Sequence, residues 1–481
     1  MKFITNLYEH QKKAVEKLSK IKIGALYMEM GTGKTRTALE LIKIRLDKGK
    51  VNHILWLCPC SVKENLKRDI KKHCTGVLSM FTICGIETLS SSVRANFALL
   101  ELVQRRNCYL IVDESNLVKN HKAKRTKNII RLAGYCKYKL ILNGTPISRD
   151  EKDLFSQWYI LDWRVLGYKS FWSFAANHLE YDENIPGRIV RCLNTDYLVK
   201  KVSPYSYQVK KDECLDLPPK TYDTEYYYLT DEQQEHYDWV ADQLLFSLDE
   251  LQPYTIYNFL SALQAVIAGY NLKIKGEEVI KKEWGFKNPI KNPRIETLLN
   301  LVDGVDEKVI IFCKYTQEIK DVVNVLNEKY GEGSAVPFYG ELKQKERQEM
   351  IKEFETNAQF FVANKVCAGY GLNLQFCSYV IYYSNDWNYA TRAQSEDRVH
   401  RMGQNENVHI VDICAAYTLD ERIIKSLENK EDLVDSFKYE LEQQKDKSFV
   451  EDFIYKRDIY GRRYKKKMKQ VDLKDLKEVE E

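Results

Sequence analysis

The sequence has no long hydrophobic run, and that absence sets the first limit on the class of protein. No apolar stretch among the 481 residues approaches the length that a membrane-spanning helix needs. The N-terminal residues do not contain the short apolar core and cleavage site of a secretory signal. The sequence therefore predicts an intracellular protein without a membrane partner. We expect it in the cytoplasm if it is bacterial or acts in a virus-infected host cell, and in the nucleus if it is eukaryotic.

Metal-ligand spacing is also missing. The 12 cysteines include no C-x-x-C pair, and the 8 histidines do not cluster. Cys58 and Cys60 form the only close pair, and most other cysteines sit in apolar runs. We expect reduced, mostly buried thiols, as in cytosolic proteins. The net charge of +5 is too small to indicate a nucleic-acid binder by itself.

A glycine-rich loop is the first positive signal. Residues 23–27 are apolar, residues 29–35 read Glu-Met-Gly-Thr-Gly-Lys-Thr, and residues 36–46 have the spacing of an amphipathic helix. Strand, glycine loop and helix in this order are the context that a phosphate-binding P-loop needs. Met28 stands at the position where the usual pattern begins with glycine.

The residues of this loop have distinct expected roles toward the phosphates of a nucleotide. Gly31, Thr32 and Gly33 form the part whose backbone N–H groups approach phosphate oxygens. Lys34 is expected to reach the β- and γ-phosphates, and Thr35 to ligate Mg²⁺. A glycine turn with an accidental lysine is the alternative interpretation, and the flanking strand and helix argue against it.

Two adjacent carboxylates end another apolar run. Asp113 and Glu114 follow residues 109–112, at the end of a strand where α/β proteins bind ligands. ATP hydrolysis needs one acid that holds Mg²⁺ and one that positions or deprotonates the attacking water. Asp113 suits the first role, with Mg²⁺ held through water, and Glu114 suits the second. A charged loop after a strand is the alternative, which the upstream P-loop disfavours.

An arginine pair far downstream also requires an anion. Residues 394–404 read Gln-Ser-Glu-Asp-Arg-Val-His-Arg-Met-Gly-Gln. On a helix, Gln394, Arg398 and Arg401 would share one face at i, i+4 and i+7. Two neighbouring guanidiniums repel each other and keep their protons, so they favour concentrated negative charge such as nucleotide phosphates. A solvated surface turn with two arginines is the alternative interpretation.

Apolar runs alternate with helix-like stretches in two separate parts of the chain. The runs are continuous, as expected for parallel strands buried on both faces. The predicted strands are 23–27, 53–57, 109–112 and 139–142 in the first part, and 309–312, 360–363, 379–383 and 409–413 in the second. The sequence therefore predicts the α/β fold class, with two parallel-sheet domains at 1–164 and 291–430.

The segments between and after these domains differ in composition. Residues 165–290 are rich in tyrosine and tryptophan and predict a helical insertion, in which a capping box at Thr230 and Gln233 opens one helix. Their aromatic rings can stack on bases, but packing between helices is the better interpretation. Residues 431–481 form a charged C-terminal extension. Its basic, tyrosine-containing stretch at 455–469 fits either phosphate contacts or a solvated tail.

The order of these motifs resembles the superfamily 2 helicases and translocases, and within them the Swi/Snf-like branch. The resemblance covers residues 7 to about 425. Its most specific parts are Lys119 and Asn120 behind the acidic pair, and residues 386–388 and 394–404. The other matching segments are 7–11, 29–35, 58–63, 113–118, 143–147, 217–220, 229–233, 292–294, 309–315 and 368–374, together with Gly340, Arg347 and Phe354.

This resemblance implies the fold and the nucleotide site. It implies two tandem RecA-like domains with ATP and Mg²⁺ as cofactors, and ATP bound between the domains. Gln11 would read adenine ahead of the P-loop. Glu114, Gln394, Arg398 and Arg401 would act in catalysis, the two arginines as fingers from the second domain.

The resemblance also implies DNA as the partner. Segments that contact nucleic acid in the family correspond here to Ser61, Lys63, Gly369, Asn373 and Trp387. Since phosphate contacts carry little sequence information, we expect DNA-stimulated ATPase activity with little sequence preference and binding that weakens steeply with salt. The expected substrate is duplex or branched DNA, along which a monomeric protein would translocate and which it would remodel, anneal or unwind.

The chain departs from the family pattern at the acidic box. Ser115 and Asn116 stand where alanine and histidine are usual, so the histidine that couples this box to other motifs is missing. Tyr389 replaces the proline expected after Asn388, and no histone-reading module or ring-finger insertion is recognisable. Two alternatives to a DNA translocase stay open: an RNA helicase, and a nucleotide-gated nucleic-acid-binding scaffold with weak turnover.

Overall fold

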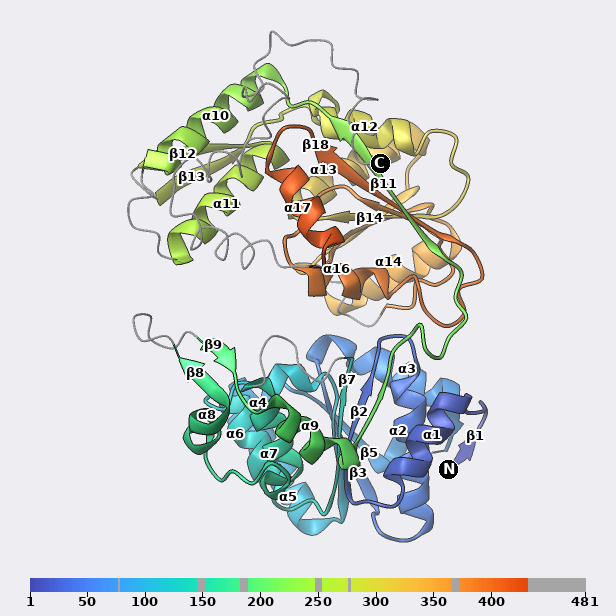
Figure 1. Cartoon of the computed structure of the whole chain (residues 1–481). Helices are drawn as coiled ribbons and strands as arrows, with labels where there is room; N and C mark the ends of the chain where they lie inside the picture. The colour runs from blue at the N-terminus through green and yellow to red at the C-terminus, as the bar shows by residue number, and fades with distance from the viewer. Residues whose placement is uncertain are drawn as a thin grey trace. The chain divides into compact units, whose positions relative to one another are not determined.

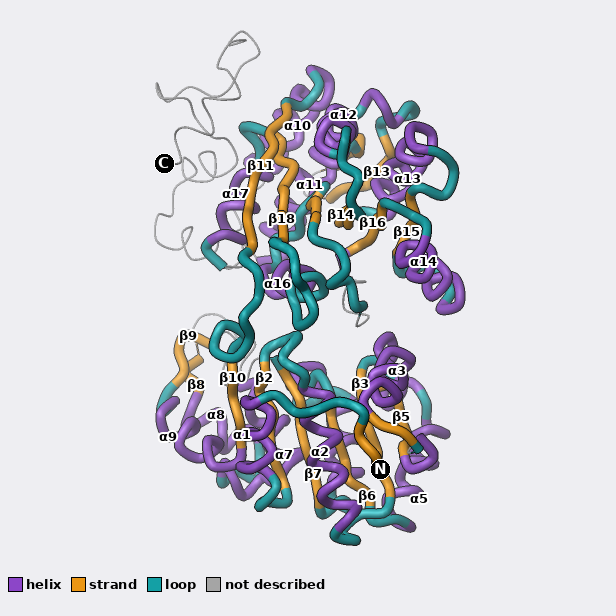
Figure 2. Tube along the Cα trace, turned by 90° about the vertical axis from the view of Figure 1, so that its right-hand side faces the viewer, coloured by secondary structure: helices purple, strands orange, loops and turns teal. Residues whose placement is uncertain are grey.

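A computed structural model describes residues 1–76, 78–144, 152–181, 189–246, 253–275, 278–365 and 372–430. The chain divides into two compact units, the first running from Met1 to Leu217 and the second beginning at Pro218. In each unit, strands lie side by side and helices surround them (Figures 1 and 2). Within the part of the chain that the structure describes, no helix is both long and apolar enough to cross a membrane.

The first unit contains a parallel sheet of six strands in the order β10-β2-β7-β6-β3-β5. Its elements are β1 (Lys2–Phe3), α1 (Glu9–Leu18), β2 (Ile23–Met28), α2 (Lys34–Asp47), β3 (His53–Cys58), η1 (Cys60–Val62), α3 (Lys63–His73), β4 (Cys74–Thr75), η2 (Leu78–Met80), β5 (Phe81–Gly85), α4 (Thr88–Ser91), α5 (Val93–Arg105), β6 (Cys108–Val112), η3 (Ser115–Val118), α6 (Lys124–Ala133), β7 (Tyr138–Asn143), α7 (Lys152–Leu166), α8 (Phe171–His178), β8 (Leu179–Tyr181), β9 (Ile189–Cys192), α9 (Thr195–Val202), η4 (Ser203–Tyr205) and β10 (Ser206–Val209).

Both faces of this sheet are buried. Successive residues of a strand point to opposite faces. Leu57 and Val112 belong to one cluster of buried residues, whereas Trp56 and Ile111 belong to another. Helices therefore cover both faces, which explains why the predicted strands read as continuous apolar runs rather than as an alternating pattern.

The second unit contains another parallel sheet of six strands, in the order β11-β18-β17-β14-β16-β15. Its elements are β11 (Lys220–Tyr227), α10 (Asp231–Phe246), α11 (Pro253–Ala268), β12 (Tyr270–Lys275), β13 (Glu278–Trp284), η5 (Pro289–Lys291), α12 (Pro293–Leu301), β14 (Val309–Cys313), α13 (Thr316–Tyr330), β15 (Ala335–Phe338), α14 (Gln344–Thr356), β16 (Phe360–Asn364), β17 (Tyr379–Tyr382), α16 (Tyr389–Glu396), β18 (Val408–Ala415) and α17 (Leu419–Glu428).

The predicted α/β class with two parallel sheets is confirmed. All eight predicted strands are present, as β2, β3, β6 and β7 in the first sheet and β14, β16, β17 and β18 in the second. Within the two six-stranded sheets, the four strands that the sequence did not predict are β5, β10, β11 and β15, which are the edge strands. An edge strand is covered less completely, so it does not need the continuous apolar sequence that identified the central strands.

The stretch 165–290, predicted as one helical insertion, is divided between the two units at Leu217. Its described residues include the helices α8 to α11, but also the edge strands β10 and β11 and the antiparallel pairs β8–β9 and β12–β13. The predicted capping box at the start of α10 is present: Thr230 Oγ1 accepts from Gln233 N at 3.2 Å, and Gln233 Oε1 accepts from Thr230 N at 3.3 Å. The predicted charged extension at 431–481 lies outside the described residues.

Candidate functional site

The phosphate loop connects β2 to α2 in the first unit. Gly31 and Gly33 have φ angles of +83° and +86°, a left-handed conformation that residues with a Cβ rarely adopt. Gly33 caps α2, so the loop wraps around the N-terminus of that helix. Unpaired N–H groups and the dipole at a helix N-terminus attract anions. The loop therefore has the local geometry that a phosphate-binding role requires.

Side chains of the loop fold back onto its first residues. Lys34 Nζ donates to the carbonyl oxygen of Met28 at 2.8 Å, and Thr32 Oγ1 donates to that of Glu29 at 2.7 Å. The ammonium group of Lys34 therefore lies against the loop, where a phosphate oxygen can replace the carbonyl as its acceptor. Thr35, the predicted Mg²⁺ ligand, lies in the first turn of α2.

Gln11 on α1 is tied to the same loop. Its Nε2 donates to the carbonyl oxygen of Thr32 at 3.1 Å, and its Oε1 accepts from the backbone N–H of Tyr8 at 3.0 Å. His10 Nε2 donates to the same Thr32 carbonyl at 2.8 Å. The structure thus shows Gln11 supporting the loop, while its predicted contact with adenine stays a prediction. Sequence reasoning missed His10, although it lies inside the matched segment.

The acidic pair lies at the end of β6. Asp113 N donates to the carbonyl oxygen of Leu57 at 2.8 Å, and Asp113 Oδ1 accepts from Glu114 N at 3.0 Å. Burial and the neighbouring charge of Glu114 raise the pKa of Asp113 to about 7, while Lys34 acts in the opposite direction. Glu114 has a φ angle of +49°, a strained conformation for a non-glycine residue. The fold therefore brings Lys34, from the start of α2, close to a carboxylate that needs a cation.

These groups match the chemistry of a Mg²⁺–nucleotide site. The Thr35 hydroxyl and the Asp113 carboxylate are hard oxygen ligands of the kind that Mg²⁺ prefers. A divalent cation beside Asp113 would favour its ionised form and so offset the effect of burial. The donor set present therefore fits the predicted cofactor.

The acidic turn is attached to α7 by a network that the sequence did not reveal. Ser115 Oγ donates to Gln157 Oε1 at 2.5 Å. Lys119 Nζ forms an ion pair with the buried Asp153 at 3.3 Å, and Ser156 Oγ donates to the carbonyl oxygen of Lys119 at 2.9 Å. The serine that replaces the usual alanine thus gains a buried partner. Gln157, Asp153 and Ser156 belong to no recognisable motif, so the sequence could not have predicted their contacts.

Asn116, which replaces the usual histidine, makes no equivalent link. Its Oδ1 is buried and has no hydrogen-bond partner among the residues that the structure describes. A buried, unpaired carbonyl oxygen costs free energy and commonly marks a functional position. Ser115 and Lys119, rather than the carbonyl oxygen of Asn116, therefore connect the acidic turn to α7.

In the second unit, the helix predicted through residues 394–401 is too long. The helix α16 ends at Glu396, so Gln394 lies on it, whereas Arg398 and Arg401 lie on the following turns. The prediction of one shared helical face is therefore wrong. Tertiary contacts explain the ending, since Leu374 N donates to the carbonyl oxygen of Arg398 at 3.0 Å and Arg401 Nη1 donates to Asn373 Oδ1 at 2.6 Å.

Buried ion pairs hold α16 on the second sheet. Arg392 donates to both carboxylate oxygens of Asp412 at 2.7 and 2.9 Å, and its Nε donates to Glu396 at 2.8 Å. Lys220 Nζ lies 2.7 Å from the other oxygen of Glu396. Burial opposes the charge on Glu396, but Arg392 and Lys220 hold the pKa of that carboxyl below its usual value. Lys220 and Glu396 lie in matched segments of the sequence, but no contact between them was predicted, and Arg392 and Asp412 were not predicted as site residues at all.

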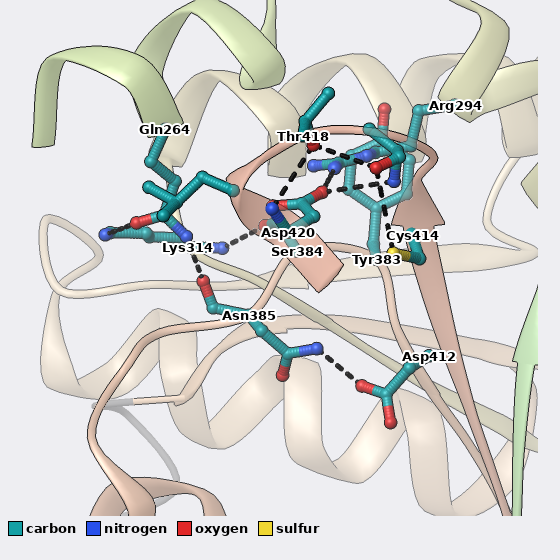
Figure 3. A network of polar contacts seen from close by, with 12 residues as sticks. Gln264, Arg294, Lys314, Tyr383, Ser384, Asn385, Asp412, Cys414, Thr418 and Asp420 are labelled. Atoms are coloured by element: carbon teal, nitrogen blue, oxygen red, sulfur yellow. Dashed lines mark hydrogen bonds and ion pairs between the residues drawn. The ribbon is translucent and has the colours of Figure 1, made fainter. Parts of the chain in front are cut away.

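A further polar network lies at the carboxyl ends of β14, β16 and β17 (Figure 3). Lys314 donates to Gln264 on α11, and Gln264 Nε2 donates to the carbonyl oxygen of Asn385 at 2.6 Å. Lys365 Nζ donates to Asn385 Oδ1 at 2.8 Å. Burial lowers the pKa of Lys314 to about 8, and burial together with Arg392 lowers that of Lys365 to about 7. Their position directly after apolar strands is a signal that could have identified both lysines.

The predicted nucleic-acid contacts lie in both units. Ser61 is in η1 and Lys63 begins α3, both partly exposed. Trp387 is only 8% exposed and packs under Lys314, whose Nζ lies 3.9 Å from the centre of the indole. Little of the ring is therefore exposed, and its predicted contact with nucleic acid stays a prediction. Gly369 and residues 145–147 lie outside the described residues.

Comparison with protein families identifies the chain. A model of the SNF2-related domain matches residues 10–269, and a model of the helicase conserved C-terminal domain matches residues 293–403. The first match covers more than half of the chain. The protein therefore belongs to the SNF2-related family.

Several curated proteins are similar along most of this chain. An uncharacterized ATP-dependent helicase of Mycoplasma genitalium is 27% identical over 90% of the chain and 42% of its own length. One of Bacillus subtilis is 26% identical over 92% of the chain and 81% of its own length. An ATP-dependent DNA helicase of Arabidopsis thaliana is 25% identical over 67% of the chain and 44% of its own length. The chain thus spans less than half the length of the Mycoplasma and Arabidopsis relatives.

Among solved structures, the chain is similar to the SWI2/SNF2 ATPase core of Sulfolobus solfataricus. The core in complex with dsDNA is 24% identical with a TM-score of 0.39, and the match covers 95% of this chain and 98% of that one. A second structure, of the core domain, is 23% identical with the same TM-score of 0.39, and the match covers 89% of this chain and 90% of that one.

Proposed function

We propose that this protein is a DNA-dependent ATPase that couples ATP hydrolysis to translocation on duplex DNA, which it remodels, anneals or unwinds. Membership of the SNF2-related family supports this function. The Mycoplasma and Bacillus relatives are named ATP-dependent helicases, and the Arabidopsis relative is named an ATP-dependent DNA helicase.

The observation that carries the proposal is the placement of the loop with Lys34 and of the acidic pair at the carboxyl ends of β2 and β6, two parallel strands of the first sheet. The charge of Lys34 acts to lower the pKa of Asp113, and Glu114 is the next residue in the turn. Nucleotide hydrolysis needs a cation that binds the phosphates, a carboxylate that binds Mg²⁺ and a second carboxylate that positions the attacking water.

Each candidate site residue of the first unit then has its own role. Lys34 and the N–H groups of the loop bind the phosphates, and Gln11 holds the loop while reading the adenine. Thr35 and Asp113 would hold Mg²⁺, which would supply positive charge to offset that of the phosphates. Glu114 orients the attacking water and accepts its proton, which is the step that a general base accelerates.

The second unit supplies the cations that stabilise the transition state. We assign this role to Arg398 and Arg401, with Gln394 on α16 supporting them. Arg401 is hydrogen-bonded to Asn373, a predicted DNA contact. DNA that engages Asn373 would therefore act directly on a catalytic arginine, which is a physical route from DNA binding to faster hydrolysis.

Phosphate release in the presence of duplex DNA, single-stranded DNA, forked DNA or RNA tests the proposal. We expect the strongest stimulation by duplex or forked DNA, and a stimulation that decreases steeply with salt. Lys34→Ala should abolish turnover, whereas the matched control Lys12→Ala removes an exposed lysine on α1 and should change nothing. Stronger stimulation by RNA would identify an RNA helicase. A wild-type rate equal to that of Lys34→Ala at saturating DNA would identify a scaffold.

A further inference from the structure

A strongly basic stretch follows the acidic turn of the first unit. No acidic residue occurs between Glu114 and Asp150, whereas a stretch of that length would on average hold about five in a chain with 69 acidic residues. Its exposed cations are Lys122, Lys124, Lys127, Arg131 and Lys137. Cations gathered in this way are the usual electrostatic footprint of a nucleic-acid partner.

Three of these cations lie on one face of α6. Lys124, Lys127 and Arg131 are exposed at i, i+3 and i+7, so they extend about 10 Å along the helix. Like charges at this spacing repel one another, and a cation in the first turn also opposes the helix dipole. The first turn of α6 contains no acidic residue. Among the residues that the structure describes, no carboxylate forms an ion pair with any of the three cations. Their repulsion is therefore relieved only by an external anion.

An exposed tryptophan stands beside these cations, at the start of α8. Trp172 is 66% exposed, more than any other of the seven tryptophans, of which Trp239 at 41% is next. Lys122 Nζ lies 5.6 Å from the centre of the Trp172 ring, and His121 stacks on Phe171 with 3.8 Å between ring centres. These two contacts fix the segment before α6 against α8, on the same side of the first unit (Figure 1).

The cations and the tryptophan form one surface. Burial lowers the pKa of His121, and the charges of Lys122 and Lys127 lower it further, so both lysines lie near the ring that stacks on α8. We call the set the basic–aromatic surface, and it consists of Lys122, Lys124, Lys127, Arg131 and Trp172.

This surface is separate from the predicted DNA contacts of the first unit. Ser61 and Lys63 lie in η1 and at the start of α3, whose buried residues belong to the hydrophobic cluster on one face of the sheet. The buried residues of α6 belong to the cluster on the opposite face. The basic–aromatic surface is therefore not part of the predicted duplex contact.

A row of cations next to an exposed indole fits single-stranded nucleic acid. Such proteins bind the backbone through cations and stack bases on aromatic side chains. The 10 Å row on α6 matches about three stacked nucleotides at about 3.4 Å each. An indole needs an unpaired base to stack on, because the bases inside a duplex are already stacked on one another.

We infer that the basic–aromatic surface binds a single-stranded segment of DNA, such as an unpaired arm of a branched substrate. Lys124, Lys127 and Arg131 contact phosphates, and Trp172, held by Lys122, stacks on a base. The inference rests on the proposed function in taking DNA as the ligand. It concerns binding by the first unit alone and requires no hydrolysis.

Removal of the charges tests the phosphate contacts. The full-length protein, without nucleotide, is titrated at several salt concentrations with a labelled oligodeoxythymidine and with a blunt duplex of the same length. For the triple variant Lys124→Gln, Lys127→Gln, Arg131→Gln, we expect weaker binding of the single strand. The slope of log K against log salt should fall in magnitude by about 2, since each phosphate contact contributes about 0.7. Binding of the blunt duplex should change by less than about twofold.

A matched control removes the same charge from the other face of the sheet. It replaces by glutamine three exposed lysines on or just after α1, whose buried residues belong to the opposite cluster. These lysines are Lys13, Lys17 and Lys20. The control should bind the single strand with the wild-type salt dependence.

Substitution of the tryptophan tests the stacking contact. Trp172→Ala should weaken binding of the single strand about tenfold or more without a change in the salt slope, and Trp172→Phe should recover part of the loss. Because Trp172 is mostly exposed, neither change opens the core. Trp239→Ala, at the other exposed tryptophan, is the control and should bind as the wild type does.

The outcomes separate this inference from the proposed function. Equal binding of the single strand by the triple variant and its α1 control would refute the phosphate contacts. If the variants weaken duplex binding as much as single-strand binding, the surface contacts duplex DNA and the inferred ligand is wrong. If these substitutions weaken single-strand binding selectively but the wild type shows no DNA-stimulated hydrolysis, the inference stands and the proposed function fails.

Discussion

The phosphate loop of the first unit (residues 29–35) and the arginine segment of the second unit (residues 394–404) are held in place by different kinds of contact. Around the loop, most contacts use backbone groups: Lys34 and Gln11 donate to carbonyl oxygens, and Gly31 and Gly33 adopt left-handed angles. Around the arginine segment, the position is set by buried charged side chains, with Arg392 at the centre.

This difference has a physical consequence. Backbone contacts depend little on side-chain identity beyond a few fixed positions, so a loop of this kind is rigid and readable as a motif. Buried ion pairs depend on both partners, because removal of one partner leaves the other charge uncompensated. The position of the arginine segment is therefore more sensitive to distant substitutions than that of the phosphate loop.

The largest expected effect concerns the arginine segment itself. Arg401→Ala should lower kcat by about 10³-fold or more, as removal of an arginine finger does, while nucleotide affinity changes little. Single-turnover hydrolysis and equilibrium binding of a fluorescent ATP analogue separate the two quantities. Equal losses in rate and affinity would show that Arg401 contacts the nucleotide already in the ground state. The arginine segment would then have no specific role in the transition state.

Substitution of Glu114 tests the predicted catalytic carboxylate of the first unit. Glu114→Gln keeps the size and most contacts of the side chain but removes its basicity, so kcat should fall by about 10²–10⁴-fold with nucleotide binding retained. Phosphate release at saturating DNA is the measurement, and Glu101→Gln, on the exposed face of α5, is a suitable control. A variant that retains turnover would show that another group positions the water.

The buried lysines of the second unit predict a pH dependence of stability. The pKa of Lys365 is lowered from 10.5 to about 7, so between these values the unfolded chain binds more protons than the folded one. The free energy of unfolding should therefore rise with pH above 7. In Lys365→Met this rise should be smaller by about 1–2 kcal/mol between pH 7 and 9, since one pKa unit corresponds to about 1.4 kcal/mol.

Urea unfolding of the wild type, Lys365→Met and the exposed-site control Lys12→Met at both pH values measures this difference. Lys314 contributes with the same sign, because its pKa is lowered as well. If Lys365→Met and the wild type show the same pH dependence of the free energy of unfolding, the titration of Lys365 does not contribute to it.

The smallest expected effect is at the acidic turn. Ser115→Ala restores the residue that is usual in the family and removes the hydrogen bond to Gln157, so we expect a loss of about 1–3 kcal/mol of stability. The rate should change by less than about threefold, because the backbone contacts of Asp113 stay in place. A tenfold loss of kcat without a loss of stability would show that side-chain contacts also position the acidic pair of the first unit.

The parts of the site that could be predicted from the sequence are those made by contiguous residues. The loop around Lys34 and the turn at Asp113 and Glu114 each follow a buried strand, and a strand–turn pattern is local. The central strands were predictable for the same reason, since burial on both faces requires continuous apolar sequence. The edge strands and the network at Ser115, Gln157 and Lys119 gave no such signal, because their partners are distant in the chain.

The sequence by itself predicted the family and the two parallel sheets, and it located the residues that we propose for the phosphate loop and the acidic pair. Only the tertiary structure decided where α16 ends, that Gln11 and His10 support the loop, and that Arg392 and Lys220 hold Glu396. The physical reason is the range of the interactions. Glycine angles and strand burial act on neighbouring residues, whereas buried charges find partners that only the completed fold brings together.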